Sequence, residues 1–112
     1  MKMTGNRYQE LAGRTMNDEL NSVEQERHAL FGMCSEIGEI QGIFQKEYQG
    51  HEINYEHLKK ELGDLLWFVA EFCTANRWDL EDVMELNIMK LNGRFPKGFE
   101  AERSLNRKEG DI

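Results

Sequence analysis

Two pairs of carboxylates, each three residues apart in a stretch with helical periodicity, constrain the fold of this chain most strongly. The first pair is Glu36 and Glu39, and the second is Glu61 and Asp64. Side chains at i and i+3 of a helix lie on one face, one turn apart, so like charges at that spacing repel each other. If the two helices lie antiparallel, the pairs face each other, and a cation between them relieves the repulsion. The spacing therefore predicts a metal site between two helices.

Apolar periodicity, capping residues and a single proline predict four helices and an all-α fold like a four-helix bundle. The expected helices span about 7–16, 22–49, 55–76 and 80–95, and the second could begin as early as 17–18. The residues expected to cap them are Asn6, Ser22 in a capping box with Gln25, Asn54 and Asp79. Gly50 is expected to end the second helix, and Pro96 ends the fourth because proline disfavours helix in the preceding residue.

The second expected helix carries apolar side chains on one face and small residues on the other. The apolar seam is Met33, Ile37, Ile40 and Phe44, and the small residues are Ser35, Gly38 and Gly42. Each interior glycine destabilises a helix by about 1 kcal/mol relative to alanine, so another helix is expected to pack closely there. A helix packed on both sides in so short a chain favours a homo-oligomer. The later helices have seams of their own, Leu58, Leu62, Leu65, Val69 and Phe72 or Cys73 in the third, and Met84, Ile88, Leu91 and Phe95 in the fourth.

Length, charge and cysteine content narrow the class of protein. The 112 residues fit one domain, 1–112, whose charged tail at 100–112 is expected to be partly disordered or packed on the surface. The net charge of −7 disfavours a nucleic-acid polymer as partner, because that binding depends on clustered Lys and Arg. No stretch reaches the roughly 18 apolar residues of a membrane span. Cys34 and Cys73, without CxxC spacing, are expected to be reduced core residues of a cytoplasmic protein.

The four carboxylates form an all-oxygen ligand set, which suits Mg²⁺, with Mn²⁺ as a possible substitute. Di-iron four-helix proteins instead use a Glu-x-x-His motif on two of their helices, and here the fourth positions are Glu39 and Asp64. The three histidines are expected to be solvated or hydrogen-bonded rather than ligands: His28, His51 and His57. Magnesium held only by carboxylates keeps positions open for water and for substrate phosphates.

A polar stripe on the fourth expected helix supplies donors for phosphate oxygens. Asn87, Lys90 and Arg94 recur there at i, i+3 and i+7. A solvated helix face with salt bridges is the alternative interpretation of this stripe. Trp67 lies away from the apolar seam of its helix, where it forms either a subunit contact or a wall on which a base stacks.

These residues resemble a known family, the MazG-like all-α nucleoside triphosphate pyrophosphohydrolases. Glu36-Ile37-Gly38-Glu39 followed by Glu61-Leu62-Gly63-Asp64-Leu65-Leu66-Trp67 resembles its ExxE…ExxD signature. Asn87-Ile88-Met89-Lys90-Leu91 leading to Arg94-Phe95-Pro96-Lys97-Gly98-Phe99 is similar to its NxxKL…R(Y/F)PxGF ending. The match spans about residues 7–99, which would be the core of the domain, and it includes Tyr8-Gln9 and Arg14-Thr15 more weakly.

The resemblance implies a Mg²⁺-dependent hydrolase that splits a nucleoside triphosphate, often a deoxynucleotide, into monophosphate and pyrophosphate to clear damaged or surplus nucleotides. It implies metal ligation by Glu36, Glu39, Glu61 and Asp64, and phosphate contacts or ligand positioning by Asn87, Lys90 and Arg94. It also implies sites at dimer interfaces, in dimers or in tetramers built as dimers of dimers.

The sequence leaves several alternatives open. Ser35 stands where many members carry an additional Glu, which leaves the number of metal ions and the general base undetermined. Base preference depends on side chains that cannot be placed from sequence, with Trp67, Tyr8 and Gln9 as candidates. The competing hypothesis is a helical oligomerisation or regulatory module that binds nucleotide or metal without hydrolysis, in which the carboxylate pairs are an ordinary acidic surface.

Overall fold

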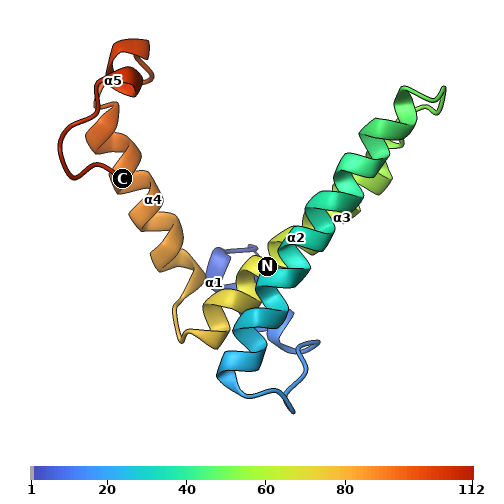
Figure 1. Cartoon of the computed structure of the whole chain (residues 1–112). Helices are drawn as coiled ribbons and strands as arrows, with labels where there is room; N and C mark the ends of the chain where they lie inside the picture. Colours follow the sequence, from blue (N-terminus) through green and yellow to red (C-terminus); the bar gives the residue numbers. More distant parts are fainter. Residues whose placement is uncertain (1) are drawn as a thin grey trace. The chain divides into compact units, whose positions relative to one another are not determined.

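Every regular element in residues 2–112, the part that the computed structural model describes, is an α-helix (Figure 1). The helices are α1 (Gly5–Gly13), α2 (Ser22–Glu47), α3 (Tyr55–Ala75), α4 (Leu80–Arg94) and α5 (Ala101–Leu105). The chain divides into a first compact unit that runs to Leu80 and a second unit, Glu81–Ile112. The all-α fold is thus confirmed, and the single-domain organisation remains a prediction. Among the described residues, no helix is long and apolar enough to cross a membrane.

The start of α2 differs by one residue from the predicted capping box. The Oδ1 atom of Asn21 accepts the Glu24 N–H at 2.9 Å, and the Glu24 carboxylate accepts the Asn21 N–H at 3.0 Å. The prediction of Ser22 with Gln25 is therefore wrong. Asn caps a helix at least as well as Ser, and Glu24 adds the reciprocal bond of the box.

The other helix starts show one further correction and one agreement. Thr4, rather than Asn6, caps α1, because its Oγ1 accepts the Arg7 N–H at 3.1 Å. Asn54 caps α3 as predicted, with Oδ1 accepting the His57 N–H at 3.0 Å. Capping motifs recur within one or two positions of each other in this chain, so local sequence alone does not choose among them.

The first unit is held together by α3, which packs against both α2 and α1. The buried apolar side chains of this unit are mostly small: Ala12, Ala29, Ala70, Cys73, Ala75 and Leu80. The Phe68 ring occupies the space that a Cβ atom on Gly32 would need, so Gly32 lets α2 and α3 approach closely. A Cβ on Gly38 or Gly42 would meet nothing within 4 Å. No helix within the described residues packs on that small face, so the close packing predicted there remains a prediction for an assembly of several chains.

Gln9 ties α1 to the turn between α3 and α4. Its side-chain amide donates to the Trp78 carbonyl at 2.9 Å, and its Oε1 accepts the Leu80 N–H at 2.7 Å. Because both ends of the amide hold backbone groups, Gln9 has a structural role at the start of α4.

Several predicted core residues are exposed in the single chain. Ile37 and Leu62 are 48% and 57% exposed, and Met84 and Ile88 of α4 are 48% and 56% exposed. Cys34 is also exposed, whereas Cys73 is buried and both thiols are free. The apolar residues buried between the helices are mostly small, and many of the larger apolar side chains stay uncovered in the single chain.

In the second unit, α4 ends where proline predicts. The Phe95 N–H still donates to the Leu91 carbonyl at 2.7 Å, and Gly98, with φ of +91°, then turns the chain. After α5 the chain folds back toward α4 (Figure 1). The tail contains a short helix that sequence reasoning missed, and Asp111 beyond it contacts Arg94 of α4.

Candidate metal centre

Three of the four predicted carboxylates converge between α2 and α3. Oxygen atoms of Glu36 and Glu39 on α2 and of Glu61 on α3 all lie within 4.8 Å of one another. The two helices lie side by side and antiparallel, joined by the short loop before Asn54 (Figure 1). Because each pair spans one helical turn, this packing turns the carboxylates of both helices toward each other.

Two carboxylate oxygens in this cluster are buried without a partner. Oε2 of Glu36 and Oε2 of Glu61 have no hydrogen-bond partner among the described residues. Buried acceptors normally find a donor, so these atoms point to a ligand outside the chain. Carboxylate oxygens are the ligands that hard divalent cations such as Mg²⁺ prefer, so the donor set fits such an ion.

The three carboxylates of the cluster shift one another's pKa values. A hydrogen bond with Glu61, followed by burial and the charge of Glu39, raises the pKa of Glu36 to about 7. The pKa of Glu39 is also raised, first through its hydrogen bond with Glu61. The pKa of Glu61 is lowered, because Glu36, Glu39 and then His57 donate hydrogen bonds to it. These shifts reflect three carboxylates held close together, and a bound cation could offset their repulsion.

Asp64, the fourth predicted ligand, is exposed on the next turn of α3 and is not part of the three-carboxylate cluster. It acts on the site through its charge, which contributes to the raised pKa of Glu36 and, after burial, to that of Tyr8. The structure therefore brings Asp64 near the cluster without placing an oxygen in it.

A cavity of about 310 Å³ opens beside the cluster, and two basic residues outside the predicted site, Lys46 and His57, help to line it. Glu39 and Glu61 line it together with Gly42, Ile43, Lys46 and His57. The His57 Nε2 atom lies 3.1 Å from Oε1 of Glu61, so the hydrogen-bonded role predicted for this histidine is confirmed. Sequence reasoning missed Lys46, although it stands two turns after Glu39 on the same helix face.

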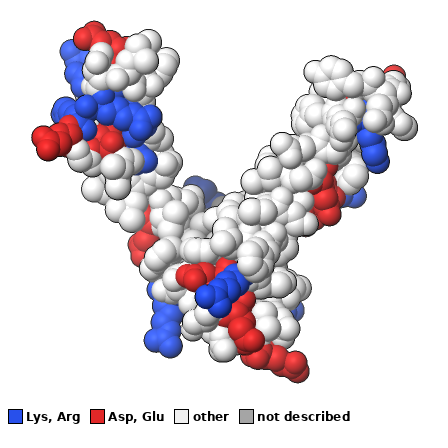
Figure 2. Space-filling view, in the orientation of Figure 1, with Lys and Arg blue, Asp and Glu red and all other residues white. Residues whose placement is uncertain are grey.

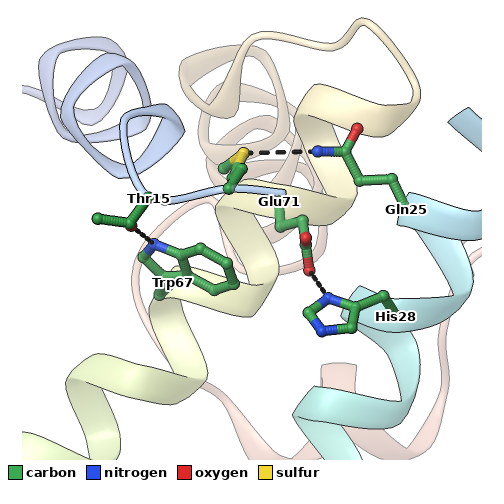
Figure 3. A network of polar contacts seen from close by, with 6 residues as sticks. Thr15, Gln25, His28, Trp67 and Glu71 are labelled. Atoms are coloured by element: carbon green, nitrogen blue, oxygen red, sulfur yellow. Dashed lines mark hydrogen bonds and ion pairs between the residues drawn. The ribbon is translucent and has the colours of Figure 1, made fainter. Parts of the chain in front are cut away.

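Trp67 of α3 is held in place by a hydrogen bond to Thr15 and by a ring contact with Phe68. Its indole N–H donates to Thr15 Oγ1 at 3.0 Å (Figure 3). Its ring also meets that of Phe68 edge-on, with centroids 5.2 Å apart. The predicted choice between a subunit contact and a base-stacking wall stays open.

The predicted phosphate-binding stripe lies on α4 in the second unit. Asn87 and Lys90 are exposed, but the guanidinium of Arg94 is engaged by the tail. Its Nε and Nη2 atoms each donate to an oxygen of Asp111 at 2.8 Å. The contact of Asp111 with Arg94 was not predicted from the sequence, because it depends on how the tail folds back. The only sequence signal for it is that the two side chains carry opposite charges.

Comparison with known proteins identifies the family. The MazG nucleotide pyrophosphohydrolase domain matches residues 24–99. The chain is also 32% identical over 85 residues to the Gene 37 protein of Mycobacterium phage L5, an alignment that covers 70% of this chain and 73% of the phage protein. No solved structure matches. The matched region includes both carboxylate pairs and the α4 stripe, and because it extends over more than half of the sequence, the chain belongs to the MazG nucleotide pyrophosphohydrolase domain family.

Proposed function

We propose that this protein is a Mg²⁺-dependent nucleoside triphosphate pyrophosphohydrolase, with a deoxynucleoside triphosphate as substrate and monophosphate and pyrophosphate as products. The observation that carries the proposal is the pair of buried oxygens on Glu36 and Glu61 that find no partner in the part of the chain the structure describes, within a cluster of three carboxylates. Clearance of damaged or surplus nucleotides in the cytoplasm is the cellular role that we propose for this activity.

Glu36, Glu39 and Glu61 would hold the metal, with Asp64 as a fourth ligand from the adjacent turn. His57, hydrogen-bonded to Glu61, would fix the orientation of that carboxylate, as residues behind metal ligands commonly do. Mg²⁺, or Mn²⁺ in its place, would supply an activated water and offset the charge on the leaving phosphate.

Substrate binding is assigned to cationic and amide side chains. Lys46 and His57 line the cavity next to the carboxylates, where donors could meet phosphate oxygens. From the resemblance, we assign phosphate contacts to Asn87, Lys90 and Arg94 as well. Trp67 is proposed to stack on the base, since its indole is held in place by Thr15.

We also propose a homo-oligomer, either a dimer or a dimer of dimers. An apolar groove of about 380 Å³ on α3 is lined by Lys59, Leu62, Gly63, Leu65, Leu66 and Val69. On α2, Phe31 is 67% exposed. Apolar surface on both helices of the carboxylate site supports association with a second copy of the chain.

The function is tested by incubating the protein with a panel of canonical and modified deoxynucleotides and Mg²⁺, and measuring released pyrophosphate. Glu61→Gln should lower turnover at least about a hundredfold, since removing even an outer partner of a metal ligand commonly has effects approaching this size. Glu56→Gln is the matched control, because Glu56 is exposed and lies one and a half turns earlier on α3.

Absence of pyrophosphate with every nucleotide, while a positive control turns over, would refute the proposal. If the protein then still bound Mn²⁺ or nucleotide, the non-catalytic binding module would be the better description. The exposed apolar faces of α2 and α3 are the observation that favours this second candidate.

A further inference from the structure

The ion pair between Arg94 and Asp111 has the geometry of an occupied anion site. Both nitrogen–oxygen distances are 2.8 Å, and the two side chains are only 10% and 14% exposed. A guanidinium presents two parallel donors, and it receives a carboxylate and a phosphate in the same bidentate arrangement. Asp111 thus holds the atoms of Arg94 that a phosphate would use.

The surroundings of Asp111 carry more positive charge than one carboxylate neutralises. Arg94, Arg103, Arg107 and Lys108 line a small cavity of about 20 Å³ together with Asp111. Arg103 also pairs with Glu100, at 3.8 Å. Figure 2 shows Lys and Arg side chains gathered over this end of α4 and α5. The hydrogen bond from Arg94, and then the charges of Arg94, Arg107 and Lys90, lower the pKa of Asp111.

A glycine turn brings the tail carboxylate to Arg94. Gly110 has φ of +85°, a conformation that residues with side chains rarely adopt, and the Asp111 N–H donates to the Lys108 carbonyl at 3.0 Å. A Cβ atom on Gly110 would meet nothing within 4 Å, so a substitution there would strain the backbone alone. The contact can therefore be weakened without changing any charge.

We propose that the end of α4 is a phosphate-binding site whose internal occupant is Asp111, so that the tail competes with the phosphates of a nucleotide or of pyrophosphate for Arg94. The proposal rests on the proposed function, in which Arg94 binds substrate. A phosphate carries more negative charge than a carboxylate and gains more from the surrounding cations, so it can displace Asp111. Release of the tail would then accompany substrate binding.

The test measures the affinity for inorganic pyrophosphate by calorimetry in the absence of metal, so that hydrolysis is not required. Asp111→Asn should bind pyrophosphate at least about fivefold more tightly than the unmodified chain, a typical size for coupling between competing contacts. Gly110→Ala should shift the affinity in the same direction. Glu109→Gln, which removes the same charge from an exposed neighbouring residue, should leave it unchanged.

The gain should disappear when Arg94→Gln is added to Asp111→Asn, because the proposed site requires that guanidinium. Weaker pyrophosphate binding by Asp111→Asn would show that Asp111 orients Arg94, and unchanged binding would show that Asp111 does not compete for it. Either result overturns the proposal. If that variant does not fold, Gly110→Ala decides by the same criterion. Tighter binding in a protein that releases no pyrophosphate from any nucleotide would preserve the anion site and refute the enzymatic function.

Discussion

The titration of Glu36 should make the metal affinity of the candidate site depend on pH. Its pKa of about 7 means that the group is mostly protonated below neutrality and ionised above it in the metal-free chain. A metal ion binds the ionised form, so the affinity for Mn²⁺ should rise between about pH 6 and about pH 8, by up to roughly tenfold per unit below the pKa. Titration calorimetry at several pH values measures this. Glu36→Gln should flatten the profile, and a flat profile in the unmodified chain would contradict the assignment.

Glu71 is fully buried, and His28 is its hydrogen-bond partner (Figure 3). The His28 Nδ1 atom lies 2.8 Å from Oε1 of Glu71, while Oε2 has no partner among the described residues. His28→Ala would leave the carboxylate unpaired, so it should lower the free energy of unfolding by about 1–3 kcal/mol. Urea unfolding checks this, with the exposed neighbour Arg27→Ala as control. Equal stability of the two variants would show that solvent replaces the imidazole.

At the scale of helices, the approach of α2 to α3 depends on Gly32. An alanine there would press against the Phe68 ring, so Gly32→Ala should lower the free energy of unfolding by about 1–3 kcal/mol. Gly38→Ala lies in the same helix with open space around the added methyl group, and it should stabilise the protein by about 1 kcal/mol. Thermal unfolding of both variants measures the difference. Similar shifts in the two would contradict the packing described here.

The helices themselves could be predicted from the sequence, because apolar periodicity, Asn54 and Pro96 are local signals. The choice of cap between Asn21 and Ser22 could not, since both residues favour that position. The sequence also did not indicate which faces of α2 and α3 are buried. Periodicity finds every apolar stripe, but it does not tell which stripes of α2 and α3 meet, because this depends on how closely two whole helices can pack.

At the scale of the whole molecule, the exposed apolar groove on α3 predicts self-association. Leu66 is 46% exposed and lines that groove. Leu66→Glu should place a charge in the proposed interface and shift the protein to monomers with unchanged helix content. Sedimentation velocity and circular dichroism measure the two quantities. Tyr48→Glu, at an exposed position outside the groove, should leave the mass unchanged. A monomeric parent protein would contradict the proposed oligomer.

Part of the candidate site could be predicted from the sequence, because three of its residues follow helical spacing. The spacing of Glu36, Glu39 and Glu61 is a local property of two helices, and antiparallel packing is enough to bring them together. The contact of Asp111 could not be predicted, because it depends on how the tail folds. The place of Lys46 at the cavity depends on the shape of that cavity, which residue spacing does not specify.

We propose that the carboxylate cluster directs cleavage between the α and β phosphates of a nucleotide. Phosphorus NMR of a deoxynucleoside triphosphate turned over with Mg²⁺ tests it most directly, because the spectrum identifies both products. We expect equal amounts of monophosphate and pyrophosphate from the unmodified protein and from Glu56→Gln, with turnover lost in Glu61→Gln. Two results would contradict this proposal. One is a nucleoside diphosphate with inorganic phosphate as products, and the other is an undiminished rate in Glu61→Gln.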